Sequence, residues 1–180
     1  SIKLLLNILD KKKLLTKKYK IKVTKNIPQK SGLGGGSMNA ASILSYFLRE
    51  KIINLSKKDV LSICSKIGSD VSLGLEIKNS ILKKNNSIRR FNIKLGLHAL
   101  LVKPNRGCMT KKIYQEVKSF TKKRINLSKN LFSIESLKNE QNDLEKPAFK
   151  IYPTLSKIKT YLYKIEQVKF VRMTGSGSTI

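Results

Sequence analysis

The spacing of hydrophobic residues changes along the first part of the chain. Leucine and isoleucine recur every three or four positions over residues 2–18, which predicts an amphipathic helix. Residues 19–26 alternate instead, with Ile21 and Val23 between polar neighbours, which predicts a half-buried strand. Glycine and proline interrupt the pattern over residues 28–36, and this stretch is therefore predicted to be a loop.

The rest of the chain continues as an alternation of helical and extended patterns. Ser56 precedes one apolar stripe as a helix N-cap, and Gly68 follows it as the C-terminal stop. The apolar run from His98 to Val102 predicts a buried strand, with the only histidine of the chain in the core. The predicted helices cover residues 37–49, 57–67, 109–121, 142–151 and 153–165, and further strands lie within 74–95, around a turn at 83–87, and at 168–173.

This order of elements predicts an α+β fold. Helices and strands mix in both halves, and we expect a boundary between two α+β units near residues 92–98. A chain of 180 residues is long enough for one domain or for two small ones.

Composition argues against several classes of protein. The chain is 40% hydrophobic, which is enough to bury a core. Lysine interrupts every apolar stretch before the roughly 18 residues that a membrane span needs, and the first residues lack the pattern of a secretory signal. Cys64 and Cys108 stand apart, which argues against a disulfide scaffold or a zinc site. We therefore expect a cytoplasmic protein in which both cysteines are packing residues.

Net charge is the most unusual feature of the composition. The 38 lysines and arginines against 11 acidic residues give a formal charge of +27, which by itself suggests a polyanionic partner. However, 32 of these basic residues are lysine, and only 6 are arginine, the residue that best recognises bases and phosphates. Abundant isoleucine and asparagine accompany the lysine, as a bias toward A- and T-rich codons explains. We therefore expect no specific nucleic acid partner and no membrane.

The segment from Pro28 to Ala41 is the most informative in the chain. A predicted strand leads into four glycines, and a predicted helix follows them. Glycine allows positive φ and brings backbone amides close to an anion. The helix N-terminus behind the glycines adds unpaired N–H donors and a partial positive charge. This arrangement predicts a phosphate-binding loop, and a flexible loop before a helix is the alternative.

Two familiar nucleotide motifs do not fit this loop. A Rossmann motif that starts at Gly32 needs glycine where Ser37 stands. A Walker A motif needs lysine after Gly36, and this chain has serine there. Any phosphate binding must therefore follow another pattern.

The loop resembles the ATP loop of the GHMP kinases, in the pattern Pro-x-x-x-Gly-Leu-Gly-Gly-Gly-Ser-x-Asn-Ala-Ala. Three further segments resemble motifs of that family, in the right order. Residues 67–71 resemble its catalytic-aspartate segment, residues 142–153 the signature of its C-terminal domain, and residues 171–179 its final glycine loop. The resemblance thus extends over nearly the whole chain.

This resemblance implies an ATP-dependent small-molecule kinase with the two-domain GHMP kinase fold. Residues 1–96 are expected to form an incomplete N-terminal ATP-binding domain, and residues 97–180 part of a ferredoxin-like C-terminal domain. ATP and Mg²⁺ are the implied cofactors, with Ser37 as a metal ligand. The implied ATP contacts are Pro28, Gly32, Leu33, Gly34, Gly35, Gly36, Ser37 and Asn39.

The resemblance also implies a catalytic base and a substrate side. Asp70 matches the aspartate that activates the acceptor hydroxyl. Its lysine partner is expected in a segment that precedes this chain, so the chain by itself is predicted to be inactive. Met38 and Ser72 stand where the family more often has serine and proline. The implied substrate contacts are Thr110, Tyr114, Gly175, Ser176 and Gly177.

The expected partner is a small molecule, a cytidine diphosphate-linked polyol whose 2-hydroxyl accepts phosphate in isoprenoid biosynthesis. The signature at residues 142–145 favours this acceptor over homoserine or a mevalonate-type alcohol, which are the alternatives within the family. A basic α+β module that binds nucleic acid is the alternative from another class. The oligomeric state is left open, with a homodimer as one option.

Overall fold

The computed structural model describes residues 1–83, 85–93, 95–121 and 132–180. The chain divides into two compact units, one made of Ser1–Asn26 and Gly34–Lys94, the other of Ile27–Leu33 and Leu95–Ile180. Each unit has a hydrophobic core of its own. The segment Ile27–Leu33 belongs to the second unit, whereas the sequence placed it in a domain of residues 1–96. The domain ranges 1–96 and 97–180 therefore stay a prediction.

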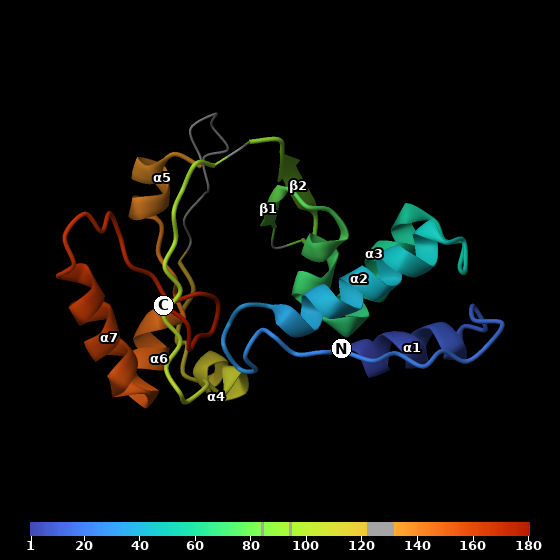
Figure 1. The fold of residues 1–180 in the computed structure, drawn as a ribbon, viewed down its shortest axis with the longest axis horizontal. Helices are drawn as coiled ribbons and strands as arrows, with labels where there is room; N and C mark the ends of the chain where they lie inside the picture. Colours follow the sequence, from blue (N-terminus) through green and yellow to red (C-terminus); the bar gives the residue numbers. More distant parts are fainter. Residues whose placement is uncertain (84, 94, 122–131) are drawn as a thin grey trace. The chain divides into compact units, whose positions relative to one another are not determined.

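The described part of the first unit contains the helices α1 (Ile2–Lys11), α2 (Gly35–Arg49), α3 (Lys57–Ile67) and the 3₁₀ helix η1 (Ser69–Leu75). Both α1 and η1 contact α2 and α3 (Figure 1). The apolar stripe of each α-helix faces the shared core, in which Leu5, Leu44 and Ile63 are almost completely buried. These helices place the end of the glycine-rich segment, from Gly34 onward, and the predicted catalytic aspartate in the same unit.

The ends of α3 follow from its local sequence. The Ser56 hydroxyl oxygen accepts a hydrogen bond from the amide of Asp59 at 3.1 Å. At the other end, the Gly68 amide donates to the carbonyl oxygen of Cys64 at 3.0 Å, and the chain then turns into η1. Both predicted ends of this helix are confirmed.

A two-stranded antiparallel hairpin completes the first unit. β1 (Asn79–Leu82) pairs with β2 (Ile88–Phe91), as the sequence predicted around its polar turn. Arg90 ties the hairpin to η1, because its guanidinium donates to the carbonyl oxygens of Ser72 at 2.8 Å and Leu73 at 3.1 Å. The described residues thus combine helices with a small sheet, in agreement with an α+β fold.

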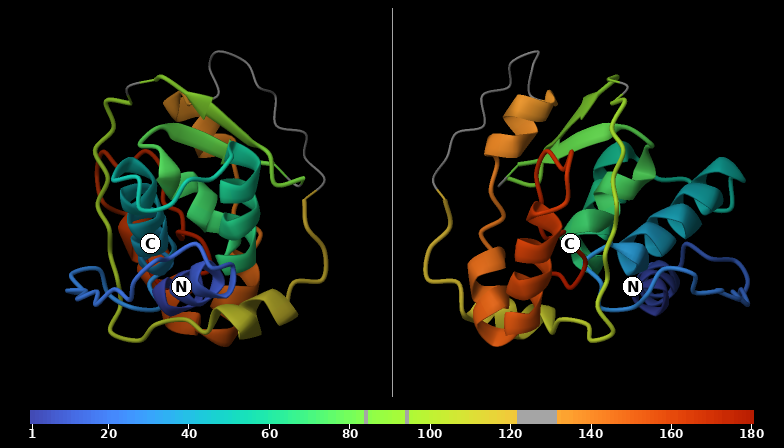
Figure 2. Two further views of the ribbon diagram at one scale, coloured as in Figure 1. Left: turned by 90° about the vertical axis from the view of Figure 1, so that its right-hand side faces the viewer. Right: turned by 60° about the vertical axis from the view of Figure 1, so that its left-hand side comes forward.

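The described part of the second unit contains α4 (Thr110–Gln115), α5 (Ile134–Asn139), α6 (Glu145–Ile151) and α7 (Pro153–Tyr163). α6 contacts α4 and lies beside α7 in both views of Figure 2. Ile113, Ala148 and Leu155 supply buried side chains from these three helices to one core. None of the described helices is long and apolar enough to cross a membrane.

The helices predicted at 2–18, 109–121, 142–151 and 153–165 are all shorter in the structure, the first two by more than five residues. α1 stops at Lys11 because Lys13 adopts a left-handed conformation (φ 52°) and the Leu14 amide bonds back to the Leu9 carbonyl at 3.0 Å. α4 stops at Gln115. Further along, the amide and the hydroxyl of Thr121 donate hydrogen bonds to the two carboxylate oxygens of Asp143, at 2.8 and 2.5 Å. The Thr121 hydroxyl, followed by its amide, lowers the pKa of Asp143. Neither α5 nor η1 was predicted.

Three predicted strands are wrong. Residues 19–26, 98–102 and 168–173 are not in strands, because a strand needs a partner backbone and the described residues offer almost none. The exception is Val102, which exchanges two hydrogen bonds with Ile180, at 2.8 and 3.0 Å. His98 is therefore exposed rather than a core histidine, and Leu100 beside it is 73% exposed.

Candidate active site

The N-terminus of α2 is open to an anion. Gly34 caps the helix in a left-handed conformation (φ 67°), and no side chain caps it. The amides of Ser37 and Met38 donate to the Gly34 carbonyl at 2.9 and 3.0 Å. The preceding amides, those of Gly35 and Gly36, have no carbonyl one turn back to bond within the helix. Together with the helix dipole they can bind a phosphate oxygen.

A polar side chain and a cation flank this helix start. With its amide oriented to satisfy both neighbours, Asn39 donates to the Gly35 carbonyl at 3.1 Å and accepts from the Lys25 ammonium at 3.1 Å. Asn39 thus connects the first residue of α2 to Lys25. Lys25 was not predicted as a site residue, because one lysine among 32 carries no signal of its own.

The predicted catalytic aspartate lies on a segment that packs against α2. A Cβ placed on Gly74 would come within 2.8 Å of Ala41 and of the Met38 sulfur, so η1 needs glycine to approach α2 this closely. At the start of η1, a Cβ on Gly68 would lie 3.9 Å from the Ser37 hydroxyl oxygen. Asp70 follows two positions later, is exposed, and accepts a hydrogen bond from the hydroxyl of Ser69 at 3.1 Å.

A cavity of about 750 Å³ opens in the first unit beside this packing. Its size is in the range of small-molecule pockets. The walls come from α2, the end of η1 and the hairpin, and they include Met38, Ser42, Leu73, Glu76 and Phe91. The first unit therefore offers a helix N-terminus, an exposed carboxylate and a cavity on connected elements.

In the second unit, the segment Ile27–Leu33 before α2 packs against residues 171–179, the C-terminal glycine loop. The Thr174 hydroxyl donates to the Gly32 carbonyl at 2.7 Å, and the Thr179 amide donates to the Ser31 carbonyl at 3.0 Å. Gly32 has φ 76°, and a Cβ there would overlap the Thr174 carbonyl oxygen and lie 2.9 Å from that of Gly177. Gly32 and the C-terminal glycine loop, which are far apart in sequence, thus lie together. Pro28 is exposed at the start of this segment, and Leu33 is half-buried at its end.

Some of the predicted substrate contacts lie together in the second unit. The hydroxyls of Thr110 and Ser176 are hydrogen-bonded at 2.8 Å, which joins the start of α4 to the C-terminal glycine loop. Gly175 and Gly177 flank Ser176 with positive φ, and a Cβ on Gly177 would come within 2.7 Å of the Met173 sulfur. Tyr114 lies on α4 and is 52% exposed, so it is available to a ligand rather than buried in the core.

Cys64 and Cys108 are packing residues, as the sequence predicted. Cys64 and Cys108 are free and buried. Burial raises the pKa of the Cys64 thiol to about 11 and also raises that of Cys108. Among the described residues, histidine, cysteine, aspartate and glutamate form no group of three that could hold a metal ion. The Ser37 hydroxyl is an oxygen donor of the kind that Mg²⁺ takes, and Mg²⁺ needs few protein ligands when phosphates supply the rest.

Comparison with known proteins identifies the family. Residues 2–76 match the GHMP kinases N terminal domain. A Pelagibacter ubique (strain HTCC1062) protein named 4-diphosphocytidyl-2-C-methyl-D-erythritol kinase is 52% identical over 182 residues, which cover 100% of this chain and 65% of that protein. A Petrotoga mobilis (strain DSM 10674 / SJ95) protein of the same name is 36% identical over 170 residues, 89% of this chain and 65% of that protein. The chain thus spans about two thirds of the length of these relatives.

A solved structure shares the fold. The crystal structure of a 4-(cytidine 5'-diphospho)-2C-methyl-D-erythritol kinase matches with a TM-score of 0.63 at 24% identity, over 86% of this chain and 57% of that one. This match agrees with the α+β fold that the sequence predicted. From the domain match, the relatives and the shared fold, we conclude that the chain belongs to the GHMP kinase family.

Proposed function

We propose that the protein containing this chain transfers the γ-phosphoryl group of ATP to the 2-hydroxyl of 4-diphosphocytidyl-2-C-methyl-D-erythritol. The observation that carries the proposal is the open N-terminus of α2 in the same unit as Asp70, with Ser37 beside the start of η1. The names of the two relatives supply the acceptor. Because the chain spans 65% of their length, the activity is assigned to the intact protein.

The ATP side is assigned to the glycine-rich segment and α2. The amides of Gly35 and Gly36 are the proposed donors to phosphate oxygens, and Ser37 is the proposed protein ligand of Mg²⁺. The metal, when bound, neutralises charge on the transferred phosphoryl group. Lys25 adds a positive charge close to Gly35 through Asn39. These groups position and stabilise the phosphates, and such a transfer needs little else from the protein.

Asp70 is the proposed general base. A base must reach the acceptor hydroxyl, and an exposed carboxylate on a segment packed against the phosphate-binding helix satisfies this need. The Ser69 hydroxyl holds one oxygen of Asp70 at 3.1 Å and leaves the other for the proton. On the substrate side we assign Thr110, Tyr114 and the loop 175–177.

Three further assignments accompany this function. We place the protein in the cytoplasm, where the substrates of such a kinase are found, and we assign it no specific nucleic acid partner. The net charge of +27 then creates a positive electrostatic field that attracts ATP and a pyrophosphate-bearing acceptor. A homodimer stays open as the state of the intact protein.

An acceptor comparison tests the proposal. The intact protein is incubated with ATP and Mg²⁺ and with one of three acceptors, the cytidyl substrate, homoserine or mevalonate, and ADP release is followed. We expect acceptor-dependent ADP release only with the cytidyl substrate. Turnover of homoserine or mevalonate instead would move the protein to another GHMP kinase activity. Retention of DNA at physiological salt without turnover of any acceptor would favour the nucleic acid alternative.

A further inference from the structure

We propose that Asn142 and Glu145 are positioning residues for the segment 30–33 that leads into α2, which they hold in place through the C-terminal glycine loop. The inference rests on the proposed function for its enzymatic readout. Both residues belong to the signature at 142–145, which resembles a family motif. All the contacts that carry the proposal lie within the second unit.

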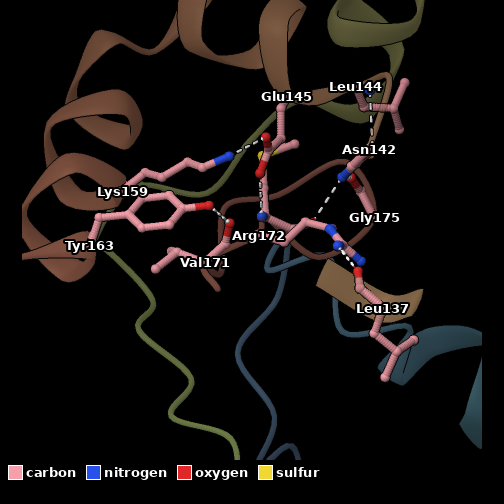
Figure 3. A network of polar contacts seen from close by, with 10 residues as sticks. Leu137, Asn142, Leu144, Glu145, Lys159, Tyr163, Val171, Arg172 and Gly175 are labelled. Atoms are coloured by element: carbon pink, nitrogen blue, oxygen red, sulfur yellow. Dashed lines mark hydrogen bonds and ion pairs between the residues drawn. The ribbon is translucent and has the colours of Figure 1, made fainter. Parts of the chain in front are cut away.

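Asn142 uses its whole amide. Its nitrogen donates to the carbonyl oxygens of Met173 at 2.8 Å and Gly175 at 2.7 Å, on the two sides of Thr174 (Figure 3). Its oxygen accepts from the Leu144 amide at 3.0 Å, at the start of α6. The side chain therefore connects the helix start to the glycine loop with both polar atoms.

Glu145 holds the same loop from the first turn of α6. One of its oxygens accepts from the Met173 amide at 2.6 Å, and the other pairs with the Lys159 ammonium of α7 at 2.5 Å (Figure 3). The carboxylate side chain is only 13% exposed, so these bonds are shielded from water and their loss is costly. Asn142 and Glu145 thus fix both backbone groups of Met173.

Thr174 connects the C-terminal glycine loop to Gly32. Its backbone amide donates to the Thr179 carbonyl at 2.9 Å and its carbonyl accepts from the Gly177 amide at 2.8 Å, so the residue cannot move independently of the turn. Its hydroxyl then donates to the Gly32 carbonyl at 2.7 Å. Gly32 is a proposed ATP contact. A displacement of residues 173–175 would therefore displace Gly32.

Asn142→Asp separates positioning from helix capping. The carboxylate keeps an oxygen to accept from Leu144, but it replaces the donor with a second oxygen that faces two carbonyls. Gln141→Glu is the matched control, because it makes the same change of charge at the adjacent, exposed position. In the intact protein we expect Asn142→Asp to raise the KM for ATP at least tenfold and Gln141→Glu to leave it within twofold.

Thr174→Val provides the second variant, because it removes only the bond to Gly32 and keeps the volume of the side chain. Its KM for ATP should rise as well. When Asn142→Asp and Thr174→Val are combined, the effect on the KM for ATP should be smaller than the two single effects together, because both variants act on one connection. A lower melting temperature with an unchanged KM for ATP in both single variants would overturn the proposal, because it would show a structural role only.

Hydrogen exchange gives a readout that does not depend on the activity. In Asn142→Asp, the amides of residues 174–179 and 30–33 should exchange at least tenfold faster than in Gln141→Glu, at conditions where both proteins are folded. Equal exchange in the two variants would overturn the positioning role. If the wild-type protein turns over no acceptor, the proposed function fails, and the exchange result still decides the inference.

Discussion

The hydroxyl of Thr174 donates a hydrogen bond to the carbonyl oxygen of Gly32 at 2.7 Å, across 142 positions of the sequence. This bond places the C-terminal glycine loop against the segment that leads into α2. The Thr179 amide adds a second connection to Ser31, at 3.0 Å. Ser31 and Gly32 therefore form one structural feature with the C-terminal glycine loop, and changes in either are expected to affect the other.

Gly32→Ala tests this close approach. The residue has φ 76°, and its new Cβ would overlap the Thr174 carbonyl oxygen. Left-handed strain alone costs about 1–2 kcal/mol, and the overlap adds to it. We expect a loss of at least about 2 kcal/mol in the free energy of unfolding, measured by urea denaturation.

Gly34→Ala is the control for this measurement. Gly34 has a similar φ of 67°, but a Cβ there meets nothing within 4 Å. Its cost should stay near the strain alone, about 1 kcal/mol. An equal loss in the two variants would show that the contact with Thr174 does not matter.

Ser56→Ala tests the N-cap of α3. The Ser56 hydroxyl accepts from the Asp59 amide at 3.1 Å, and this variant leaves that amide without its cap. We expect a loss of about 1 kcal/mol in the free energy of unfolding. Ser65→Ala, on the exposed side of the same helix, should change it by less than about 0.5 kcal/mol. Equal effects would argue against the capping role.

Thr179→Val tests a buried hydroxyl of the C-terminal glycine loop. The Thr179 side chain is completely buried, and its hydroxyl has no partner among the described residues. Replacing it with a methyl group of similar size removes the cost of burying a polar atom. Thermal unfolding should show unchanged stability or a gain of up to about 1 kcal/mol. A clear loss would mean that the hydroxyl has a bonding partner in solution.

Cys64 predicts a pH dependence of stability. Burial raises its pKa from 9.0 to about 11 in the folded protein, so the unfolded chain loses the thiol proton first as the pH rises. The contribution of Cys64 to stability is therefore full below pH 9 and declines between pH 9 and about 11. Unfolding curves at pH 8.5 and 10.5 should show a larger drop for the wild type than for Cys64→Ala. The same drop in both would contradict the raised pKa.

Sequence patterns predicted α2 and α3 closely, because each buries one apolar stripe and begins or ends at a recognisable residue. The cap at Ser56 and the glycine turn before α2 are examples. The strands at 19–26, 98–102 and 168–173 were wrong, since alternation or apolar character cannot supply a partner backbone. For the same reason only Val102, which has Ile180 opposite, shows any pairing.

The candidate site was predicted as a set of residues but not as a set of contacts. The glycine motif and Asp70 were found through their family pattern. The bond from Thr174 to Gly32 and the position of Lys25 beside Asn39 depend on long-range packing. No local pattern of charge or periodicity carries that information.

The central claim is that Asp70 activates an acceptor hydroxyl for phosphoryl transfer from ATP. The most direct test is transfer of radiolabelled phosphate from γ-labelled ATP to the cytidyl substrate by the intact protein and its Asp70→Asn variant, with Asp10→Asn as an exposed control. Removal of a general base costs about 10²–10⁴-fold in rate. We predict transfer by the wild type and the control, and a kcat at least a hundredfold lower in Asp70→Asn with the KM for ATP within about threefold. Wild-type turnover in Asp70→Asn would contradict the account.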